Sequence, residues 1–245
     1  MEERNTITEL ERIIKEKEIG KKIEINGRTF VVDGDYGLRE IDEKEYLLCG
    51  TVRLTDLQSF CTLIKEEIKK LDTKLFIQVI DPKTVVALTT LDDKNRRFEP
   101  YVCEYHKTGA EFNNFNEYER FVINLRANFE QTDDTLNVMR MIGNIVNCDN
   151  QELQDDGVTQ SVRTQRGTQI GSQDVKSIIR LAPFRTFPEV PQPISEFLFR
   201  IKDNGTRFGL FEADGGRWEI EAKRNIANFI SSNLLGYEDK VVVLM

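Results

Sequence analysis

The chain has 245 residues, among them 34 Lys or Arg, 42 Asp or Glu and one His, which gives a net charge of −8. This length is enough to bury the core of one large domain or two small ones. The 15 Phe and six Tyr exclude a disordered chain, which lacks large apolar side chains. No apolar run approaches the roughly 20 residues of a helix that crosses a bilayer, so we expect no association with a membrane.

The N-terminal sequence and the cysteines indicate a reducing compartment. Met1–Asn5 lacks the basic and then apolar order of a secretion signal. Widely spaced cysteines without a CxxC pair favour free thiols in the cytoplasm. The four cysteines are Cys49, Cys61, Cys103 and Cys148. Because zinc needs four clustered Cys or His ligands and His106 is the one histidine, we predict neither a metal site nor a cofactor.

The first part of the chain predicts a helix followed by a β-hairpin. Thr8–Lys17 has apolar residues at helical spacing. Two β-rich runs, Lys21–Asn26 and Arg28–Val32, flank Asn26-Gly27, and Asn-Gly is the strongest short signal for a hairpin because both turn positions need positive φ.

The middle of the chain predicts helices packed on an antiparallel sheet. Leu54–Leu71 has the clearest helical periodicity, and Thr55 opens a capping-box sequence at its start. Three β-rich runs joined by turns follow it, and such an order indicates an α+β fold. These runs are Leu75–Ile80, Thr84–Thr90 and Phe98–His106. Two further helices are then expected, one capped by Asn116 and one opened by Thr132.

The last third is expected to be rich in strands. Val158–Thr164 predicts a polar strand, and residues 165–174 predict a loop. Gly215-Gly216 predicts a hairpin turn between strands. The remaining predicted elements are strands over Val175–Leu181, Glu196–Lys202, Arg207–Glu212 and Val241–Leu244, and a helix over Ala222–Leu235. We therefore predict an α+β domain over residues 1–150 and a β-rich part over residues 151–245, packed together as one unit.

The residue types that carry catalysis give weak signals. Cys103 and His106 are three apart on a predicted strand, so their side chains face opposite sides and cannot share a proton. Adjacent aspartates occur at predicted turns and helix starts, where Asp is favoured for local hydrogen bonds. These pairs are Asp92-Asp93, Asp133-Asp134 and Asp155-Asp156. We predict no catalytic residue.

Arginines in the last third are the candidate site for binding phosphate or a partner. Residues 1–156 carry a net charge of −10, whereas residues 157–224 carry +3. Arginine forks suit phosphate oxygens, and nearby phenylalanines offer faces on which bases stack. The alternative, a solvated surface of ordinary composition, is favoured for a charge this small. The candidate residues are Arg163, Arg166, Arg180 and Arg185.

The order of elements resembles the YfdQ-like proteins, a bacteriophage and prophage family of unknown function. Three stretches carry the resemblance: Asp56–Phe60 leading to Thr73–Phe76, Tyr105-His106 followed by the helix near Tyr118, and the strands Val158–Thr164, Ile178–Pro183 and Glu196–Asp203. The resemblance implies a phage or prophage origin and no particular site residue.

Three hypotheses for function follow. The first is a non-enzymatic phage accessory protein that acts early in infection, in the host cytoplasm, on host machinery, defence signalling or DNA metabolism. The second is a protein that binds single-stranded nucleic acid through the C-terminal arginines, and the third is a metal-dependent hydrolase built from Asp and Glu. The expected partners are a second copy of the chain, a host protein, and a nucleotide or single-stranded nucleic acid.

Overall fold

A computed structural model describes most of the chain. The described residues are 20–25, 28–32, 38–41, 50–71, 73–92, 95–106, 109–146, 150–155, 160–166, 169–203 and 206–245, without the side chains of residues 28, 39–41, 150–155, 162–166 and 169–175. The chain divides into two compact units, residues 1–50 and residues 51–245.

The described part of the first unit is a three-stranded antiparallel sheet in the order β1-β2-β3. Its strands are β1 (Lys22–Ile25), β2 (Arg28–Val32) and β3 (Leu38–Ile41). Ile25 pairs with Arg28, so two residues connect β1 to β2, and the predicted hairpin is confirmed. The predicted helix Thr8–Lys17 lies outside the described residues.

The second unit contains a five-stranded mixed sheet in the order β15-β5-β6-β7-β4. Its strands are β4 (Val52–Leu54), β5 (Leu75–Asp81), β6 (Thr84–Thr89), β7 (Tyr101–Glu104) and β15 (Val241–Leu244). The three central strands are antiparallel as predicted, whereas β15 is parallel to β5 and β4 is parallel to β7.

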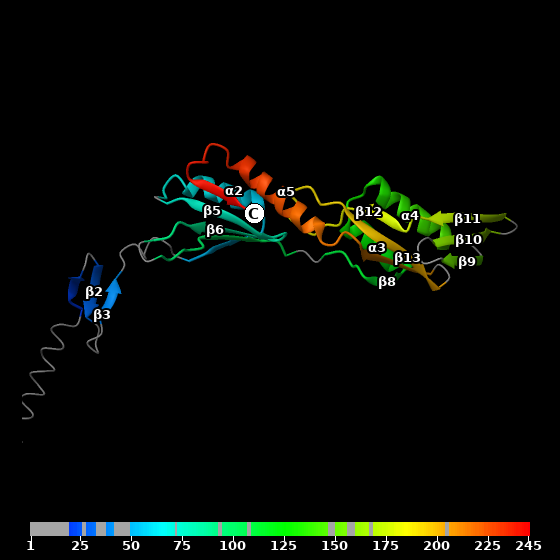
Figure 1. The fold of residues 1–245 in the computed structure, drawn as a ribbon, viewed down its shortest axis with the longest axis horizontal. Coiled ribbons are helices and arrows are strands. Elements are labelled where there is room, and N and C mark those ends of the chain that lie inside the picture. The colour runs from blue at the N-terminus through cyan, green and yellow to red at the C-terminus, as the bar shows by residue number, and fades with distance from the viewer. Residues whose placement is uncertain are drawn as a thin grey trace, which may run out of the picture. The chain divides into compact units, whose positions relative to one another are not determined.

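Two helices, α2 (Leu57–Glu67) and α5 (Arg217–Asn233), pack against this sheet (Figure 1). The core between them consists of fully buried apolar residues of the sheet and both helices, among them Phe60, Ile64, Ile77, Ile226 and Ile230. Asp56 is the N-cap of α2 and accepts a hydrogen bond from the backbone N–H of Ser59 at 2.7 Å. The predicted cap at Thr55 is wrong by one residue, because Asp supplies a carboxylate acceptor at the next position.

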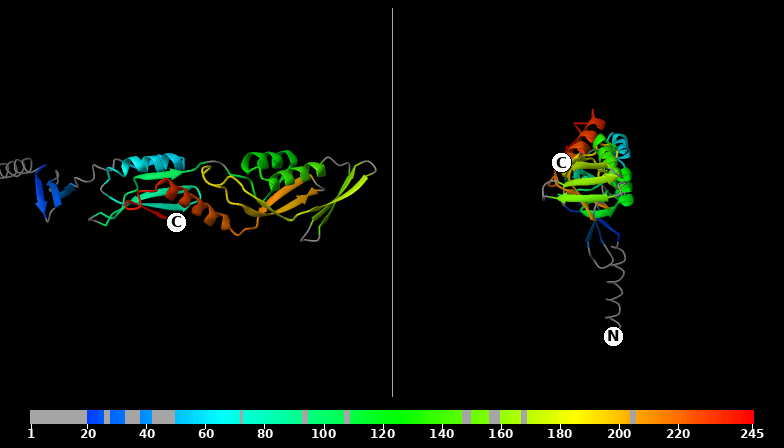
Figure 2. Two further views of the ribbon diagram at one scale, coloured as in Figure 1. Left: turned by 90° about the horizontal axis from the view of Figure 1, so that it is seen from above. Right: turned by 90° about the vertical axis from the view of Figure 1, so that its right-hand side faces the viewer.

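A second, antiparallel sheet has the order β12-β13-β14-β8. Its strands are β8 (Asn114–Glu117), β12 (Ile178–Leu181), β13 (Ser195–Lys202) and β14 (Arg207–Glu212). Helices α3 (Tyr118–Asn128) and α4 (Asp133–Val146) lie together against it (Figure 2, left). Their shared core is aromatic and includes Phe121, Phe129, Phe197, Phe199 and Phe208.

The structure confirms one of the two predicted helix starts in this region. The backbone N–H of Thr135 donates to Oγ1 of Thr132 at 3.3 Å, immediately before α4, as predicted. Asn116 was predicted as a helix cap, but it lies in β8, where it pairs with Phe208, and the N-cap of α3 is Glu117. Pairing with β14 therefore decides the conformation of this segment, and local sequence does not.

A third sheet, in the order β11-β10-β9, is antiparallel and polar in sequence. Its strands are β9 (Asn150–Asp155), β10 (Gln160–Arg166) and β11 (Gln169–Val175). The predicted loop over residues 165–174 is wrong because residues 169–175 form β11, which pairs with β10 as a hairpin. Hydrogen bonds to β10 hold β11 in place. Its sequence lacks the alternation of apolar and polar residues that predicts a strand.

The predicted turn at Gly215-Gly216 does not join two strands. Gly216 has φ of 81°, which L-residues rarely adopt, and it is the N-cap of α5. Trp218 therefore lies in the first turn of this helix, and α5 begins five residues earlier than the predicted start at Ala222.

The α+β fold class is confirmed. Both large sheets combine strands from before and after residue 150, since β8 pairs with β14 and β15 pairs with β5. None of the helices in the described part of the chain combines the length and apolar sequence needed to cross a membrane.

Candidate functional site

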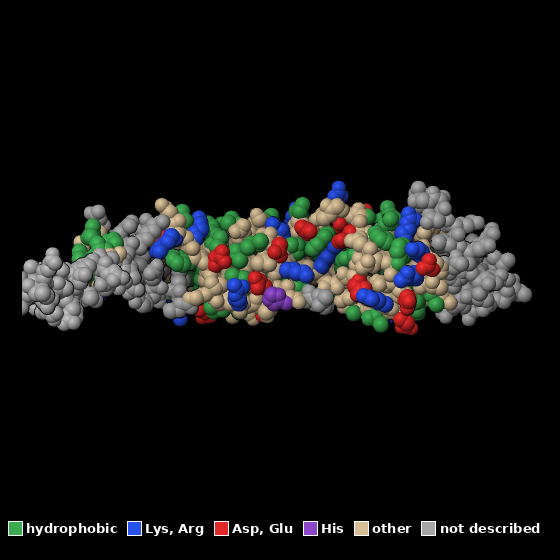
Figure 3. Space-filling view, turned by 90° about the horizontal axis from the view of Figure 1, so that it is seen from below, with side chains coloured by type: hydrophobic (Ala, Val, Ile, Leu, Met, Phe, Trp, Pro, Cys, Tyr) green, Lys and Arg blue, Asp and Glu red, His purple; other side chains and the backbone are tan. Residues whose placement is uncertain are grey.

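The four candidate arginines occupy different environments. Arg163 and Arg166 lie on β10, and their side chains are outside the described part of the structure. Arg180 lies exposed on β12, whereas Arg185 is 5% exposed in the segment that connects β12 to β13. On the face drawn in Figure 3, basic and acidic side chains are interspersed across the described residues without a continuous basic stripe.

Arg185 is enclosed by acidic and aromatic side chains of this same chain. Its Nη1 donates to Glu212 Oε1 at 2.6 Å, and its Nη2 lies 4.0 Å from Asp214 Oδ2 and donates to the Ser195 hydroxyl. The guanidinium lies 3.9 Å from the centre of the Trp218 ring. Burial lowers the pKa of Arg185, and the neighbouring carboxylates of Glu212 and Asp214 oppose this effect. Arg185 therefore interacts with residues of this same chain. It connects the segment between β12 and β13 to Glu212 on β14 and to Trp218 on α5.

Three hydrogen bonds connect the segment that follows Arg185 to the turn between β5 and β6 and to helices α2 and α5. Thr186 Oγ1 donates to the carbonyl of Pro82 at 2.6 Å. Glu189 Oε1 accepts from the backbone N–H of Leu57 at 2.7 Å, which satisfies an otherwise free donor at the start of α2. The side chain of Asn225, on α5, donates to the carbonyl of Pro191 at 3.0 Å. These bonds hold the loop around residue 190 beside α5.

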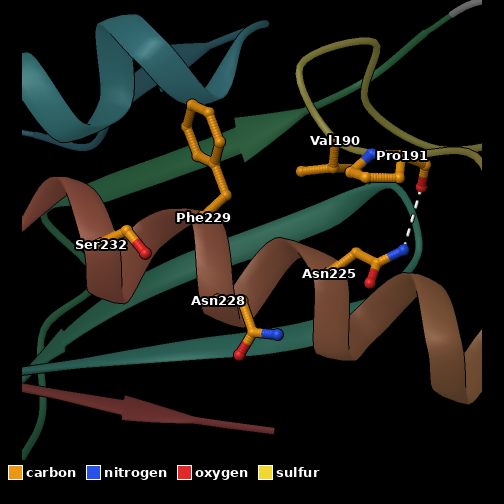
Figure 4. Close-up of a pocket in the computed structure, with 6 residues that line it drawn as sticks. All are labelled: Val190, Pro191, Asn225, Asn228, Phe229 and Ser232. Carbon is orange, nitrogen blue, oxygen red and sulfur yellow. Dashed lines mark hydrogen bonds between the residues drawn. The ribbon is translucent and has the colours of Figure 1, made fainter.

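A groove of about 300 Å³ lies between this loop and α5 (Figure 4). We call it the α5 groove, and it is lined by Val190, Pro191, Asn225, Asn228, Phe229 and Ser232. Asn225, Asn228 and Ser232 recur at helical spacing along one stripe of α5, and Phe229 rises from the same helix towards α2 (Figure 4). The lining thus combines three apolar residues with amide and hydroxyl groups of α5.

The side chains that line the α5 groove are uncharged. Asn amides donate and accept hydrogen bonds, and so does the Ser232 hydroxyl, which matches the N–H and C=O groups of a peptide backbone. Pro191 and Phe229 offer apolar surface for a side chain, whereas Val190 is buried beside them. Recognition of phosphate uses Arg or Lys, which this lining does not contain.

The remaining candidate groups for catalysis are separated by the fold. Cys103 is fully buried, whereas the side chain of His106 is 70% exposed and its Nε2 lies 3.8 Å from Glu104 Oε2. Burial raises the pKa of Cys61 and of Cys103 to about 12, so both thiols stay protonated and are poor nucleophiles at neutral pH.

The adjacent aspartates do not contribute to a metal-binding cluster in the part of the chain that the structure describes. No group of three or more His, Cys, Asp or Glu there could hold a metal ion. Asp133 and Asp134 lie in the first turn of α4, where their charge favours the helix N-terminus. Asp93 and Asp156 lie outside the described residues.

The α5 groove was not predicted from the sequence. The helix itself was predicted over Ala222–Leu235. The polar stripe of Asn225, Asn228 and Ser232 was the available signal, but such a stripe is also what a solvated helix face contains.

The comparisons with known proteins add no relative. No family model matches this chain, and neither a curated protein nor a solved structure matches it.

Proposed function

We propose that this chain is a non-enzymatic binding protein whose α5 groove takes an uncharged peptide segment of a protein partner. The observation that carries the proposal is the lining of the groove, which combines apolar residues with amide and hydroxyl groups and has no charged side chain. A bound segment would place an apolar side chain against Pro191 and Phe229. Its backbone would exchange hydrogen bonds with Asn228 and Ser232.

The same lining favours peptide over nucleic acid. Binding of nucleic acid depends on basic side chains that neutralise phosphates. Arg185, one of the candidate arginines for that role, is buried and paired with Glu212. The groove instead offers the groups that protein partners use, namely apolar contact and neutral hydrogen bonds.

The resemblance to the YfdQ-like proteins supports a biological setting for this activity. A phage or prophage protein that binds a segment of a host protein would act in the host cytoplasm on host machinery, defence signalling or DNA metabolism. The proposed partner is therefore a host protein that exposes an uncharged, apolar segment.

A matched pair of α5 variants tests the groove. Ser232→Trp places a large side chain in the groove, whereas Ser231→Trp changes an exposed neighbour that does not line it. Peptides selected from a random display library on the wild-type chain are labelled, and their affinities are measured by fluorescence anisotropy. We expect Ser232→Trp to weaken binding more than about tenfold, because the indole occupies the groove. A tenfold loss of affinity corresponds to about 1.4 kcal/mol. Ser231→Trp should leave the affinity unchanged.

Three results would contradict the proposal. Selection could yield no peptide, or the selected peptides could bind both variants as tightly as the wild type. Selected peptides with strongly acidic sequences would indicate a basic site elsewhere. Labelled oligo-dT is measured in the same assay at low salt, where salt-sensitive binding would support the nucleic-acid hypothesis instead.

A further inference from the structure

The strand β15 is an edge strand whose outer side has no strand partner among the described residues. The backbone N–H of Leu75, on β5, donates to the carbonyl of Lys240 at 2.9 Å. In the parallel register that follows, the N–H and C=O groups of Val242 and Leu244 face β5. The N–H and C=O of Val243 therefore point away from the sheet.

β15 is short, with four residues, but its sequence lacks the residue types that usually protect such an edge. Natural edge strands carry Lys or Pro, or contain a bulge that interrupts pairing. Val241–Leu244 has neither residue type, and its register with β5 is continuous. The side chains of Val242 and Leu244 are 37% and 40% exposed.

These two exposed side chains share the face of the sheet that lies opposite the helices. Val242 and Leu244 pair with Phe76 and Gln78 on β5. Those residues alternate with Ile77, which is buried in the core under α2 and α5. At Val243, the outer edge of β15 thus presents backbone groups with no partner among the described residues, together with apolar surface.

We infer that β15 pairs with β15 of a second copy of this chain, antiparallel and around a twofold axis beside Val243. Val243 and the partner subunit's Val243 then exchange two N–H to C=O hydrogen bonds. Val242 lies opposite the partner subunit's Leu244, and Leu244 opposite the partner subunit's Val242. The Val241 N–H already donates to the carbonyl of Tyr237, and the twofold contact satisfies the outward groups of Val243. It also covers both exposed side chains, and such self-complementarity is what an interface between identical subunits requires. This contact goes beyond the proposed function, because the α5 groove contains no residue of β15.

Two variants of Val243 test whether the backbone of β15 makes the contact. Val243→Pro removes an N–H that faces away from β5, a position where sheets tolerate proline. Val243→Ala shortens the same side chain but keeps the N–H. Sedimentation velocity of the full chain over a concentration series should show dimers for the wild type and for Val243→Ala. Val243→Pro should raise the dimer dissociation constant more than about tenfold with an unchanged far-UV circular dichroism spectrum.

Charge variants test the antiparallel register. Val242→Lys/Leu244→Lys and Val242→Glu/Leu244→Glu should each be monomeric, because like charges oppose each other across the axis. Mixing the two variants should restore a dimer in which opposite charges are paired. A monomeric wild type, a dimer that Val243→Pro leaves intact, or a mixture that stays monomeric would overturn the inference.

Discussion

Replacement of Arg185 by methionine should destabilise the second unit by about 3 kcal/mol. Removing one partner of a buried ion pair costs about 3–5 kcal/mol, because the other charge stays buried without compensation. Asp214 has a side chain that is 9% exposed, whereas that of Glu212 is 37% exposed and regains water. The lower end of the range therefore applies, and it includes the loss of the contact with Trp218.

Urea unfolding followed by far-UV circular dichroism measures this change. With a slope of about 1–3 kcal/mol per M, the midpoint should fall by about 1 M or more. Arg185→Lys should lie between the wild type and Arg185→Met, since lysine keeps the charge but not the fork. Arg180→Met removes an exposed arginine and should change the unfolding free energy by less than about 0.5 kcal/mol. Equal effects of Arg180→Met and Arg185→Met would refute the structural role of Arg185.

Two further predictions concern packing and pH. A Cβ on Gly209 would lie 2.8 Å from the ring of Phe211 and 3.0 Å from the carbonyl oxygen of Asn114. Gly209→Ala should therefore lower the free energy of unfolding, measured in urea, by about 1–3 kcal/mol. Gly109 has open space around it, so Gly109→Ala should change this free energy little. Equal losses for the two variants would contradict the reasoning. Burial raises the pKa of Cys61 from 9.0 to about 12, so the thiol ionises at lower pH in the unfolded chain than in the folded protein. The free energy of unfolding should therefore fall as the pH rises between these two pKa values, by up to about 1.4 kcal/mol per pH unit. Thermal melts from pH 8 to 11 should show a smaller decline for Cys61→Ala, and identical declines would argue against this ionisation.

Elements with strong local signals were predicted well. The Asn26-Gly27 sequence is a short-range hairpin signal, and the strands on either side of it, β1 and β2, pair as expected. The apolar spacing of Leu54–Leu71 likewise predicted α2, which spans Leu57–Glu67. Phe197 and Phe199 alternate at period two on β13, a spacing typical of a core-facing strand, and both lie in the aromatic core.

Elements whose conformation depends on distant partners were predicted less well. The polar strand β11 forms because β10 offers a complete backbone ladder, and no apolar alternation marks it in the sequence. Asn116 has the side chain of a helix cap, yet pairing with β14 holds it in a strand. Gly215-Gly216 allows positive φ in a hairpin turn and at a helix start, and packing selects the helix start.

The sequence alone determined the α+β class and most helices, because helical periodicity and turn residues act over a few positions along the chain. Only the tertiary structure decided that Arg185 is buried against Trp218 and Glu212, and that the loop around residue 190 lies beside α5. Both outcomes depend on burial and hydrogen bonds between residues far apart in sequence. The hydrogen bond from Asn225 to Pro191 spans 34 positions, and such contacts form only when the sheets and helices have packed.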